Sequence, residues 1–424
     1  MTEPEKAILV VGTTQDYISL IRKTAVVPYL FLTDIKIGRQ DKENSFFGKE
    51  QVLCQLSDVS DTAAKLAGHL RRWNLVLAGI TCFDCESMKL AAVLARRYSL
   101  PYPSVRSIGL CRDKYASKIR WKGRGLKCPQ ARRVRSAGDA ARFLIQAKGL
   151  VVLKPASGSG SEMVFLCASA GQARGRYRLI RSLLWHKRND GLYKLNRPAS
   201  ELIVAEEYIE GQEYSCDYLI DARQARLLRL TKKIPERAGP FGTTHGYLLT
   251  DCKKAGINQN HLLRILSRSA ESLGMARCIG MMDFIVKDKA IYLLETAPRF
   301  GGDCLAYLLR KACFFDIFKF SFQFAAGKSH MPGPKQMDAR AMYLGFKILG
   351  KKQGRIQSID LSAAQKDKRV LEIGLSAGVG HIIKKPPLDV DSRVLGYGIA
   401  RLDPSSDPAE QLEDIHSKII IRMS

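Results

Sequence analysis

A lysine followed by a run of glycine and serine is the first group of residues that could do chemistry. Lys154 ends the apolar stretch Leu150–Leu153, the loop Pro155-Ala156-Ser157-Gly158-Ser159-Gly160-Ser161 follows, and Met163–Cys167 has the pattern of a second strand. Small residues let the backbone close on a ligand, and their N–H groups can point at phosphate oxygens. Because the lysine precedes the glycines, the loop is neither a P-loop nor a protein-kinase loop. The pattern predicts a flexible flap over a phosphate, with a plain Gly/Ser hairpin as the alternative.

A second candidate group is a pair of acids at the end of a strand. The apolar stretch Leu202–Ala205 runs into Glu206 and Glu207, turns at Gly211, and resumes as Tyr214–Ile220. Carboxylates at that position could accept hydrogen bonds from an adenine amino group or from ribose hydroxyls. A solvated hairpin tip is the alternative.

The hairpin 281–295 contains a further pair of acids. Asp283 and Glu295 are the only charged residues in its two apolar strands. Buried carboxylates need a partner, and Mg²⁺ binds one or two carboxylates together with substrate phosphates. A symmetric turn centred between Asp288 and Lys289 would place the acids on opposite faces of the sheet. They can share one ion only if the turn has an odd number of residues or one strand carries a bulge.

The segment directly after this hairpin, Thr296-Ala297-Pro298-Arg299-Phe300-Gly301-Gly302-Asp303, combines a guanidinium with a Gly-Gly turn. Beside a metal-binding pair, such a group suits a phosphate or another oxyanion.

The elements that must position these residues fall into three regions. Alternating strand and helix patterns predict a parallel α/β unit at the N-terminus, with strands at 7–12, 28–33 and 75–80 and helices at 15–24, 60–73 and 85–98. A helix-rich piece then runs to about residue 148. Strand–turn–strand signals follow at 150–168, 202–220, 225–232 and 279–296, with helices at 171–187 and 259–274, which is typical of an α+β domain with an antiparallel sheet. Strands at 341–347 and 369–374 indicate a small C-terminal lobe.

Composition limits the class of protein. The chain has 424 residues, 46% hydrophobic and 26% charged, which fits a globular protein of two or three domains. No apolar run reaches the roughly 18 residues of a membrane span, and no secretory signal is expected. The 11 scattered cysteines predict reduced thiols in a cytoplasmic protein. The net charge of +27 is spread along the chain, which favours a solvated basic face over a polyanion site, and nucleic acid is not expected as a partner.

Four motifs in order carry a family resemblance: Arg112-Asp113-Lys114, the loop 154–161, the stretch 205–214 and the stretch 281–303. Together they resemble the ATP-grasp superfamily, and within it the carboxylate–amine ligases similar to bacterial L-amino acid ligases. The resemblance implies a Rossmann-like domain at 1–105 and an ATP-grasp domain at 106–330 with antiparallel sheets and a lid at about 148–212. A C-terminal lobe at 331–424 would complete the ATP-grasp region.

The resemblance also implies a role for each matching residue. Lys114 and Lys154 would hold the phosphates of ATP, and the flexible flap would comprise Ser157, Gly158, Ser159, Gly160 and Ser161. Glu206 and the backbone of Glu207, Tyr208 and Ile209 would contact adenine, and Glu213 the ribose. Asp283 and Glu295 would coordinate magnesium, and Arg299, together with Lys154, would be catalytic.

The reaction implied is the joining of a small carboxylate to an amine through an acyl-phosphate, with release of ADP and phosphate. Amino acids are among the substrates implied, and a homodimer is the implied assembly. One position departs from the pattern. Many members of the family carry Asn two residues after the second metal acid, and here that residue is Ala297. This departure and the net charge of +27 motivate one alternative, a non-catalytic nucleotide- or polyanion-binding protein. A biotin-carboxylase-like enzyme that activates bicarbonate is kept as a further alternative.

Three weaker motifs remain open. Cys82 and Cys85 form a single CxxC, which is weak evidence for metal or redox chemistry. His245 could orient a substrate or lie in an exposed loop. Of Lys232 and Lys233, adjacent in a strand, one is expected to face a substrate and the other the solvent.

Overall fold

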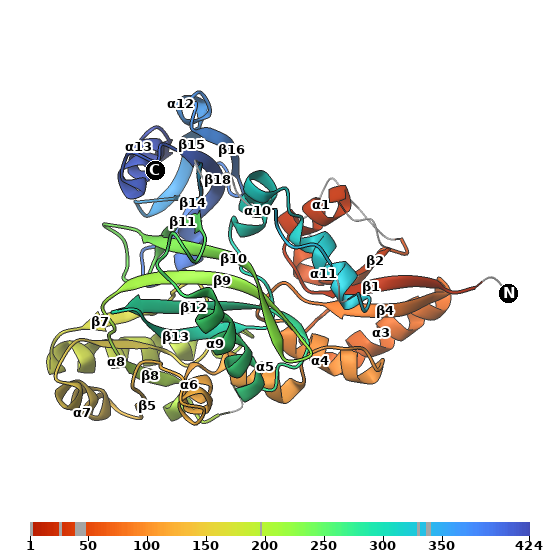
Figure 1. Ribbon diagram of the computed structural model, residues 1–424, viewed down its shortest axis with the longest axis horizontal. Helices are drawn as coiled ribbons and strands as arrows, with labels where there is room; N and C mark the ends of the chain where they lie inside the picture. The colour runs from red at the N-terminus through yellow and green to blue at the C-terminus, as the bar shows by residue number, and fades with distance from the viewer. Residues whose placement is uncertain (1–2, 25–27, 39–47, 196, 329–330, 336–340) are drawn as a thin grey trace.

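The N-terminal region folds as a parallel α/β unit. A computed structural model describes residues 3–24, 28–38, 48–195, 197–328, 331–335 and 341–424. Four parallel strands lie in the order β3-β2-β1-β4 (Figure 1): β1 Glu5–Val11, β2 Tyr29–Asp34, β3 Gln51–Cys54 and β4 Leu75–Thr81. Their helices are α1 Gln15–Thr24, α2 Ile35–Gly38, α3 Val59–Arg72 and α4 Met88–Arg97. The predicted elements coincide with these within a few residues, whereas β3, a short edge strand, gave no sequence signal.

The second unit is a smaller antiparallel sheet covered by helices. Its strands lie in the order β5-β8-β6-β7: β5 Ala131–Arg133, β6 Val151–Pro155, β7 Phe165–Cys167 and β8 Ile203–Glu207. Around it are α5 Val105–Arg112, α6 Lys114–Lys122, α7 Ala137–Ala147, α8 Ala170–His186 and the short 3-10 helix η1 Ala199–Glu201. Strand β7 begins two residues later than expected, because Met163 has a φ of 59° and belongs to the turn that closes the flap.

The largest sheet has eight strands in the order β13-β12-β9-β10-β11-β14-β18-β16. These are β9 Gln212–Asp221, β10 Gln224–Pro235, β11 Thr244–Thr250, β12 Cys278–Lys287, β13 Ala290–Ala297, β14 Met342–Leu349, β16 Val370–Leu375 and β18 Val394–Leu402. The helices between them are α9 Gln259–Ser272, α10 Leu305–Cys313 and α11 Ile317–Ala325. Strands β14, β18 and β16 extend this sheet and bring C-terminal residues to the centre of the molecule.

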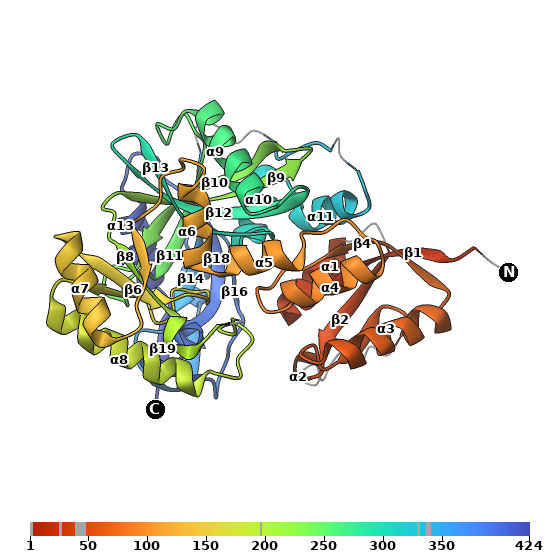
Figure 2. The same cartoon turned by 90° about the horizontal axis from the view of Figure 1, so that it is seen from below.

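The C-terminal region adds a three-stranded sheet, β17-β15-β19, beside the large sheet. It comprises β15 Gly354–Asp360, β17 Ile382–Ile383 and β19 Ile420–Met423, with α12 Ser362–Gln365, the 3-10 helix η2 Val390–Arg393 and α13 Pro408–Ser417. In both views the smaller antiparallel sheet with α7 and α8 lies at one end of the large sheet, and the N-terminal unit lies at the other (Figures 1 and 2). Within the described residues, no helix combines the length and apolar character that a membrane crossing requires.

An aromatic cluster joins the N-terminal unit to the centre of the molecule. Phe83, which follows β4, lies 5.0 Å from Phe300 and 5.1 Å from Phe318 of α11, measured between ring centroids. Aromatic pairs at this spacing add to the free energy that area burial alone supplies. The cluster therefore fixes the segment that contains Arg299 against the end of a strand of the parallel sheet.

Candidate active site

Two adjoining clefts lie between the smaller antiparallel sheet and the large sheet. The first, which we name the lid-side cleft, has a volume of about 610 Å³. The second, the inner cleft, has a volume of about 410 Å³ and is bounded on its far side by the C-terminal strands. Most predicted site residues line the lid-side cleft: Lys114, Lys154, Ser157–Ser159, Ser161, Glu206–Ile209, Glu213, Asp283 and Glu295. Gly160 and Arg299 line the inner cleft. The fold thus gathers all predicted residues in one place.

Asp283 and Glu295 lie directly opposite each other on β12 and β13. The turn between these strands has two residues, Asp288 and Lys289, both with positive φ, and it pairs Phe284 with Leu293. The register then shifts, so that Leu294 is an extra residue and Asp283 pairs with Glu295. The bulge puts the two acids on the same face of the sheet, which is the geometry that sharing an ion requires.

Each of these acids already contacts an ammonium group. Lys114 Nζ lies 3.0 Å from Glu295 Oε2 and donates to the carbonyl of Gly158 at 2.9 Å. Lys233 Nζ donates to Asp283 Oδ2 at 2.9 Å and to Glu213 Oε1 at 2.5 Å. Burial acts to raise the pKa of Glu295, but Lys114 and Lys154 outweigh it and hold that pKa well below its usual range. Burial likewise acts to lower the pKa of Lys233, but Asp283 and Glu213 raise it overall. Glu295 is therefore ionised.

Lys154 belongs to a buried network that sequence analysis did not foresee. Its Nζ lies 2.8 Å from Glu206 Oε2, and Lys118 Nζ lies 2.9 Å from Glu206 Oε1. Lys118 is fully buried and also donates to the carbonyl of the bulge residue Leu294 at 2.7 Å. Burial lowers the pKa of Lys118 to about 8, although Glu206 acts in the opposite direction. The four-residue interval between Lys114 and Lys118, one face of helix α6, was the available signal.

The chain segment that follows Glu206 has a defined backbone. The amide of Glu207 donates to the carbonyl of Gln130 at 2.8 Å, and that of Tyr208 to Leu150 at 3.0 Å. No acceptor within the described residues takes the amide of Ile209. Of the three residues whose backbone was predicted to contact adenine, Ile209 is thus the one whose N–H is available.

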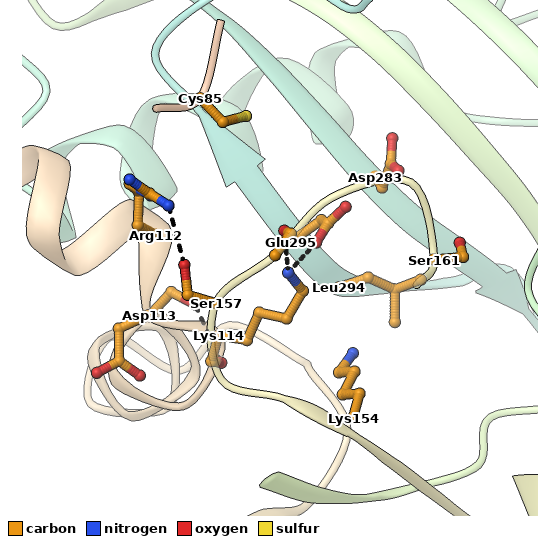
Figure 3. Close-up of polar contacts among 12 residues, drawn as sticks. Cys85, Arg112, Asp113, Lys114, Lys154, Ser157, Ser161, Asp283, Leu294 and Glu295 are labelled. Atoms are coloured by element: carbon orange, nitrogen blue, oxygen red, sulfur yellow. Dashed lines mark hydrogen bonds and ion pairs between the residues drawn. The ribbon is translucent and has the colours of Figure 1, made fainter. Parts of the chain in front are cut away.

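The flap is held over the clefts at several points. Arg112 Nη2 donates to Ser157 Oγ at 3.2 Å, Ser157 Oγ donates to the carbonyl of Leu192 at 2.8 Å, and Ser161 Oγ donates to the carbonyl of Gly242 at 2.7 Å. Lys114 and Lys154 extend toward the hairpin that carries Asp283 and Glu295 from the side of the flap (Figure 3). The flap therefore spans from helix α5 to the loop between β10 and β11.

The position of Arg299 depends on a buried ion pair. Arg229 Nε donates to Asp217 Oδ2 at 2.6 Å, and Asp217 Oδ1 accepts the amide of Gly301 at 2.7 Å. A Cβ at Gly301 would lie 2.6 Å from the end of the Leu305 side chain and 2.9 Å from the Arg229 guanidinium, so a larger residue there would displace both. Arg299 itself donates to the carbonyl of Phe300 at 2.7 Å and contacts Cys85 Sγ at 3.2 Å, while its buried Nε has no partner.

The weaker motifs separate into residues inside and outside the clefts. Lys233 points into both clefts and Lys232 is exposed, as the strand alternation predicted. Cys85 lines the inner cleft, whereas Cys82 is buried, and both thiols are free. His245 is neither exposed nor in a cleft: it is buried against His416, with a centroid separation of 4.9 Å. The prediction that His245 lies in an exposed loop is therefore wrong, because β11 begins at Thr244 and His245 faces the core beneath α13.

The residues present fit a divalent cation held together with phosphates. Among the described residues, no group of three or more His, Cys, Asp or Glu side chains is arranged to hold a metal on its own. Asp283 and Glu295 nevertheless share one face, and the buried Asp283 Oδ1 has no hydrogen-bond partner. Two carboxylates with an unfilled oxygen suit Mg²⁺ that completes its shell with phosphate and water.

Residues 111–303 match the model of the ATP-grasp domain, so this region of the chain forms an ATP-grasp domain. A D-alanine–D-alanine ligase from Paracidovorax citrulli is 25% identical over 253 residues, which cover 57% of this chain and 70% of that protein. The matched segments span between 60% and 70% of the length of the D-alanine–D-alanine ligases found.

Solved structures resemble the whole chain. An L-amino acid ligase from Bacillus licheniformis superposes with a TM-score of 0.75 at 15% identity, covering 100% of both chains. Biotin carboxylase from Campylobacter jejuni gives a TM-score of 0.67 at 13% identity, covering 99% of this chain and 92% of that one. The chain thus contains an ATP-grasp domain at 111–303 and has sequence relatives among ligases, which agrees with the resemblance seen in its motifs.

Proposed function

We propose that the protein is an ATP-dependent ligase that joins a carboxylate to an amine through an acyl-phosphate. The observation that carries this proposal is the meeting of Lys114, Lys154 and Lys233 with Asp283 and Glu295 in one cleft. Three ammonium groups and a pair of acids suit a triphosphate and its metal ion.

The first chemical step would be attack of a carboxylate oxygen on the γ-phosphorus of ATP, with ADP as the leaving group. Carboxylate and phosphate repel each other, so their charge must be neutralised as they approach. Lys154 and Lys114 extend from the flap side, and Arg299 faces the inner cleft with a free donor. Asp283 and Glu295 would hold magnesium, which when bound would supply a Lewis acid that withdraws charge from the phosphate.

The second step would be attack of an amine on the acyl carbon, with phosphate as the leaving group, to form an amide. Water competes with the amine at this stage. The flap is fastened to Leu192 and Gly242 by Ser157 and Ser161, and this closure would exclude water. The inner cleft, which adjoins the phosphate-facing residues, would hold the carboxylate and the amine.

The test is an ADP-release screen over amino acids and small carboxylic acids with Mg-ATP, followed by mass detection of the product. Release stimulated by an acid and an amine together, with an amide product, supports the proposal. A non-catalytic binder, which Ala297 and the charge of +27 motivate, would leave ATP unchanged and bind nucleic acid in a salt-sensitive manner. Bicarbonate-stimulated ATP hydrolysis would favour the biotin-carboxylase-like alternative.

Location and assembly complete the proposal. All cysteines carry free thiols, which supports a cytoplasmic location. The homodimer remains a prediction, and light scattering of the purified protein tests it.

A further inference from the structure

The flap contains a buried acid, Glu162, directly after its Gly/Ser run. Glu162 is 8% exposed and lies in the turn that closes the flap. Its two carboxylate oxygens accept from Lys187 Nζ at 2.6 and 2.7 Å, and Oε2 also accepts from the hydroxyl of Tyr193. Hydrogen bonds to an ionised group are among the stronger polar contacts. These contacts, which we name the Glu162 tie, fasten the flap to the segment 187–193, which we name the anchor segment.

The anchor segment has a defined backbone and a buried end. The amide of Asp190 donates to the carbonyl of Lys187 at 2.9 Å. Asp190 Oδ1 accepts the amide of Leu192 at 2.9 Å, and the carbonyl of Asp190 accepts the amide of Tyr193 at 3.2 Å. Leu192 and Tyr193 are both buried in the apolar core of the smaller antiparallel sheet. The segment is therefore a fixed base to which the flap can be fastened.

The start of the flap rests on the same anchor segment. Ser157 Oγ donates to the carbonyl of Leu192 at 2.8 Å. A Cβ built on Gly158 would lie 2.9 Å from the ring of Tyr193, and Gly158 has a φ of 143°. Burial and the neighbouring Glu162 raise the pKa of Tyr193 above its usual range, so its hydroxyl keeps the proton that it donates. Tyr193 thus supports the flap at two points, with its ring under Gly158 and its hydroxyl on Glu162.

The stretch between these two attachments has available donors. Within the part of the chain that the structure describes, no acceptor takes the amides of Gly158, Ser159 or Gly160. Amides in a loop of small residues can bind phosphate oxygens. Their position over the clefts depends on both ends of the stretch, and Glu162 holds the second end through its side chain. Loss of the Glu162 tie would therefore let this stretch lift away from the clefts more often.

We propose that Glu162, held by Lys187 and Tyr193, is a positioning residue that keeps the flap closed while the acyl-phosphate waits for the amine. A flap that opens at this stage would admit water, and ATP would be consumed without amide formation. This inference rests on the proposed function for the identity of the intermediate, whereas the Glu162 tie itself does not depend on it. The carboxylate acts only as a hydrogen-bond acceptor, and no covalent bond is made or broken at Glu162.

The experiment compares wild type with Tyr193→Phe, Glu162→Gln and a matched control, all as full-length protein. Tyr193→Phe removes the hydroxyl but keeps the ring under Gly158, and Glu162→Gln keeps the shape of the side chain but removes its charge. The control is Tyr177→Phe. Tyr177 is buried in the same apolar core, and its hydroxyl donates to the carbonyl of Arg135 at 2.6 Å, a contact that does not involve the flap.

Limited proteolysis by subtilisin measures how often the flap opens, without nucleotide and without turnover. The masses of the fragments identify cuts within residues 157–163. Both Tyr193→Phe and Glu162→Gln should be cut there at least about 10-fold faster than wild type, since cleavage follows the population of the open segment and a hydrogen bond to a charged group contributes that factor. Tyr177→Phe should be cut at the wild-type rate. The inference is overturned if Tyr193→Phe is cut no faster than Tyr177→Phe.

The ratio of amide formed to ADP released is measured separately, with the acid and the amine that the screen finds. This ratio should fall at least about twofold in Tyr193→Phe and Glu162→Gln and stay unchanged in Tyr177→Phe. A general loss of activity would lower both products together and leave the ratio as it is. Faster cleavage of the flap in these variants, with no amide made by wild type, would overturn the ligase proposal and leave the Glu162 tie standing. Faster cleavage with an unchanged ratio would overturn the role of Glu162 in excluding water.

Discussion

Asp283 and Glu295 face each other across β12 and β13 only because Leu294 is an extra residue in β13. The two-residue turn at Asp288 and Lys289 would otherwise oppose Asp283 with Leu294 and leave Glu295 on the other face of the sheet. The carbonyl of Leu294 accepts from the buried Lys118, so the bulge has a fixed partner in helix α6. The same bulge thus places both acids on one face of the sheet and, through Lys118, connects their hairpin to the network around Glu206.

We expect Glu295→Gln to raise the magnesium concentration for half-maximal ADP release at least about 10-fold, because the amide loses the negative charge that a hard cation prefers. A magnesium titration at saturating ATP measures this. The control is Glu210→Gln, an exposed acid that lines neither cleft. An unchanged titration for Glu295→Gln would contradict metal binding at this residue.

Lys154→Ala is expected to abolish turnover, because the flap side would lose the ammonium group that we propose to face the phosphates. The same change leaves Glu206 with Lys118 as its remaining cation. Single-turnover ADP release distinguishes this loss from slow product release. If kcat is retained, Lys154 does not belong to the phosphate site.

Replacing Ala297 by Asn tests the departure from the family pattern. Ala297 is two residues after Glu295 on the same strand and lines the inner cleft, so an amide there would face the metal side. We expect unchanged or tighter magnesium binding, measured by the same titration. A total loss of activity would show that the metal site has been assigned to the wrong place.

Lys118→Met should destabilise the protein by about 3–5 kcal/mol, because it removes one partner of a buried ion pair and leaves the Leu294 carbonyl without a donor. Urea unfolding measures the free energy. The double variant with Glu206→Gln should recover part of the loss, and exposed Lys122→Met on the same helix should cost little. Equal stability of Lys118→Met and Lys122→Met would rule out a structural role for the buried network.

The pH dependence of stability should carry a contribution from His245. Burial lowers the pKa of His245 to about 3, and the neighbouring His416 lowers it further. Below about pH 6.5 the unfolded chain therefore binds a proton at His245 that the folded protein does not bind. The contribution of His245 to the free energy of unfolding is thus complete above about pH 6.5 and declines as the pH falls toward 3. Between pH 7.5 and pH 5 the loss should be about 2 kcal/mol, at about 1.4 kcal/mol per pH unit below 6.5.

His245→Gln should remove this part of the slope, while exposed His261→Gln should keep it. Urea unfolding at pH 7.5 and pH 5 gives the change in the free energy of unfolding with pH. A loss of stability that is the same at both pH values does not alter this change. Parallel slopes in wild type and His245→Gln would mean that His245 takes up a proton in the folded state.

Much of the architecture followed from local pattern. The alternation of apolar strands and amphipathic helices predicted the N-terminal parallel unit and the antiparallel sheets, because periods of 2 and 3.6 residues are local properties of the chain. The order of the four motifs also predicted which residues would meet. Their individual roles and the domain boundaries stay predictions that the experiments above address.

The sequence by itself determined the residue types, the turns and the order of the motifs, since these depend on neighbours along the chain. Only the tertiary structure decided the bulge at Leu294, the burial of Lys118 and His245, and the unfilled amide of Ile209. Each of these depends on packing between segments far apart in sequence, where a register shift of one residue reverses a side chain and a distant partner decides whether a charge is neutralised.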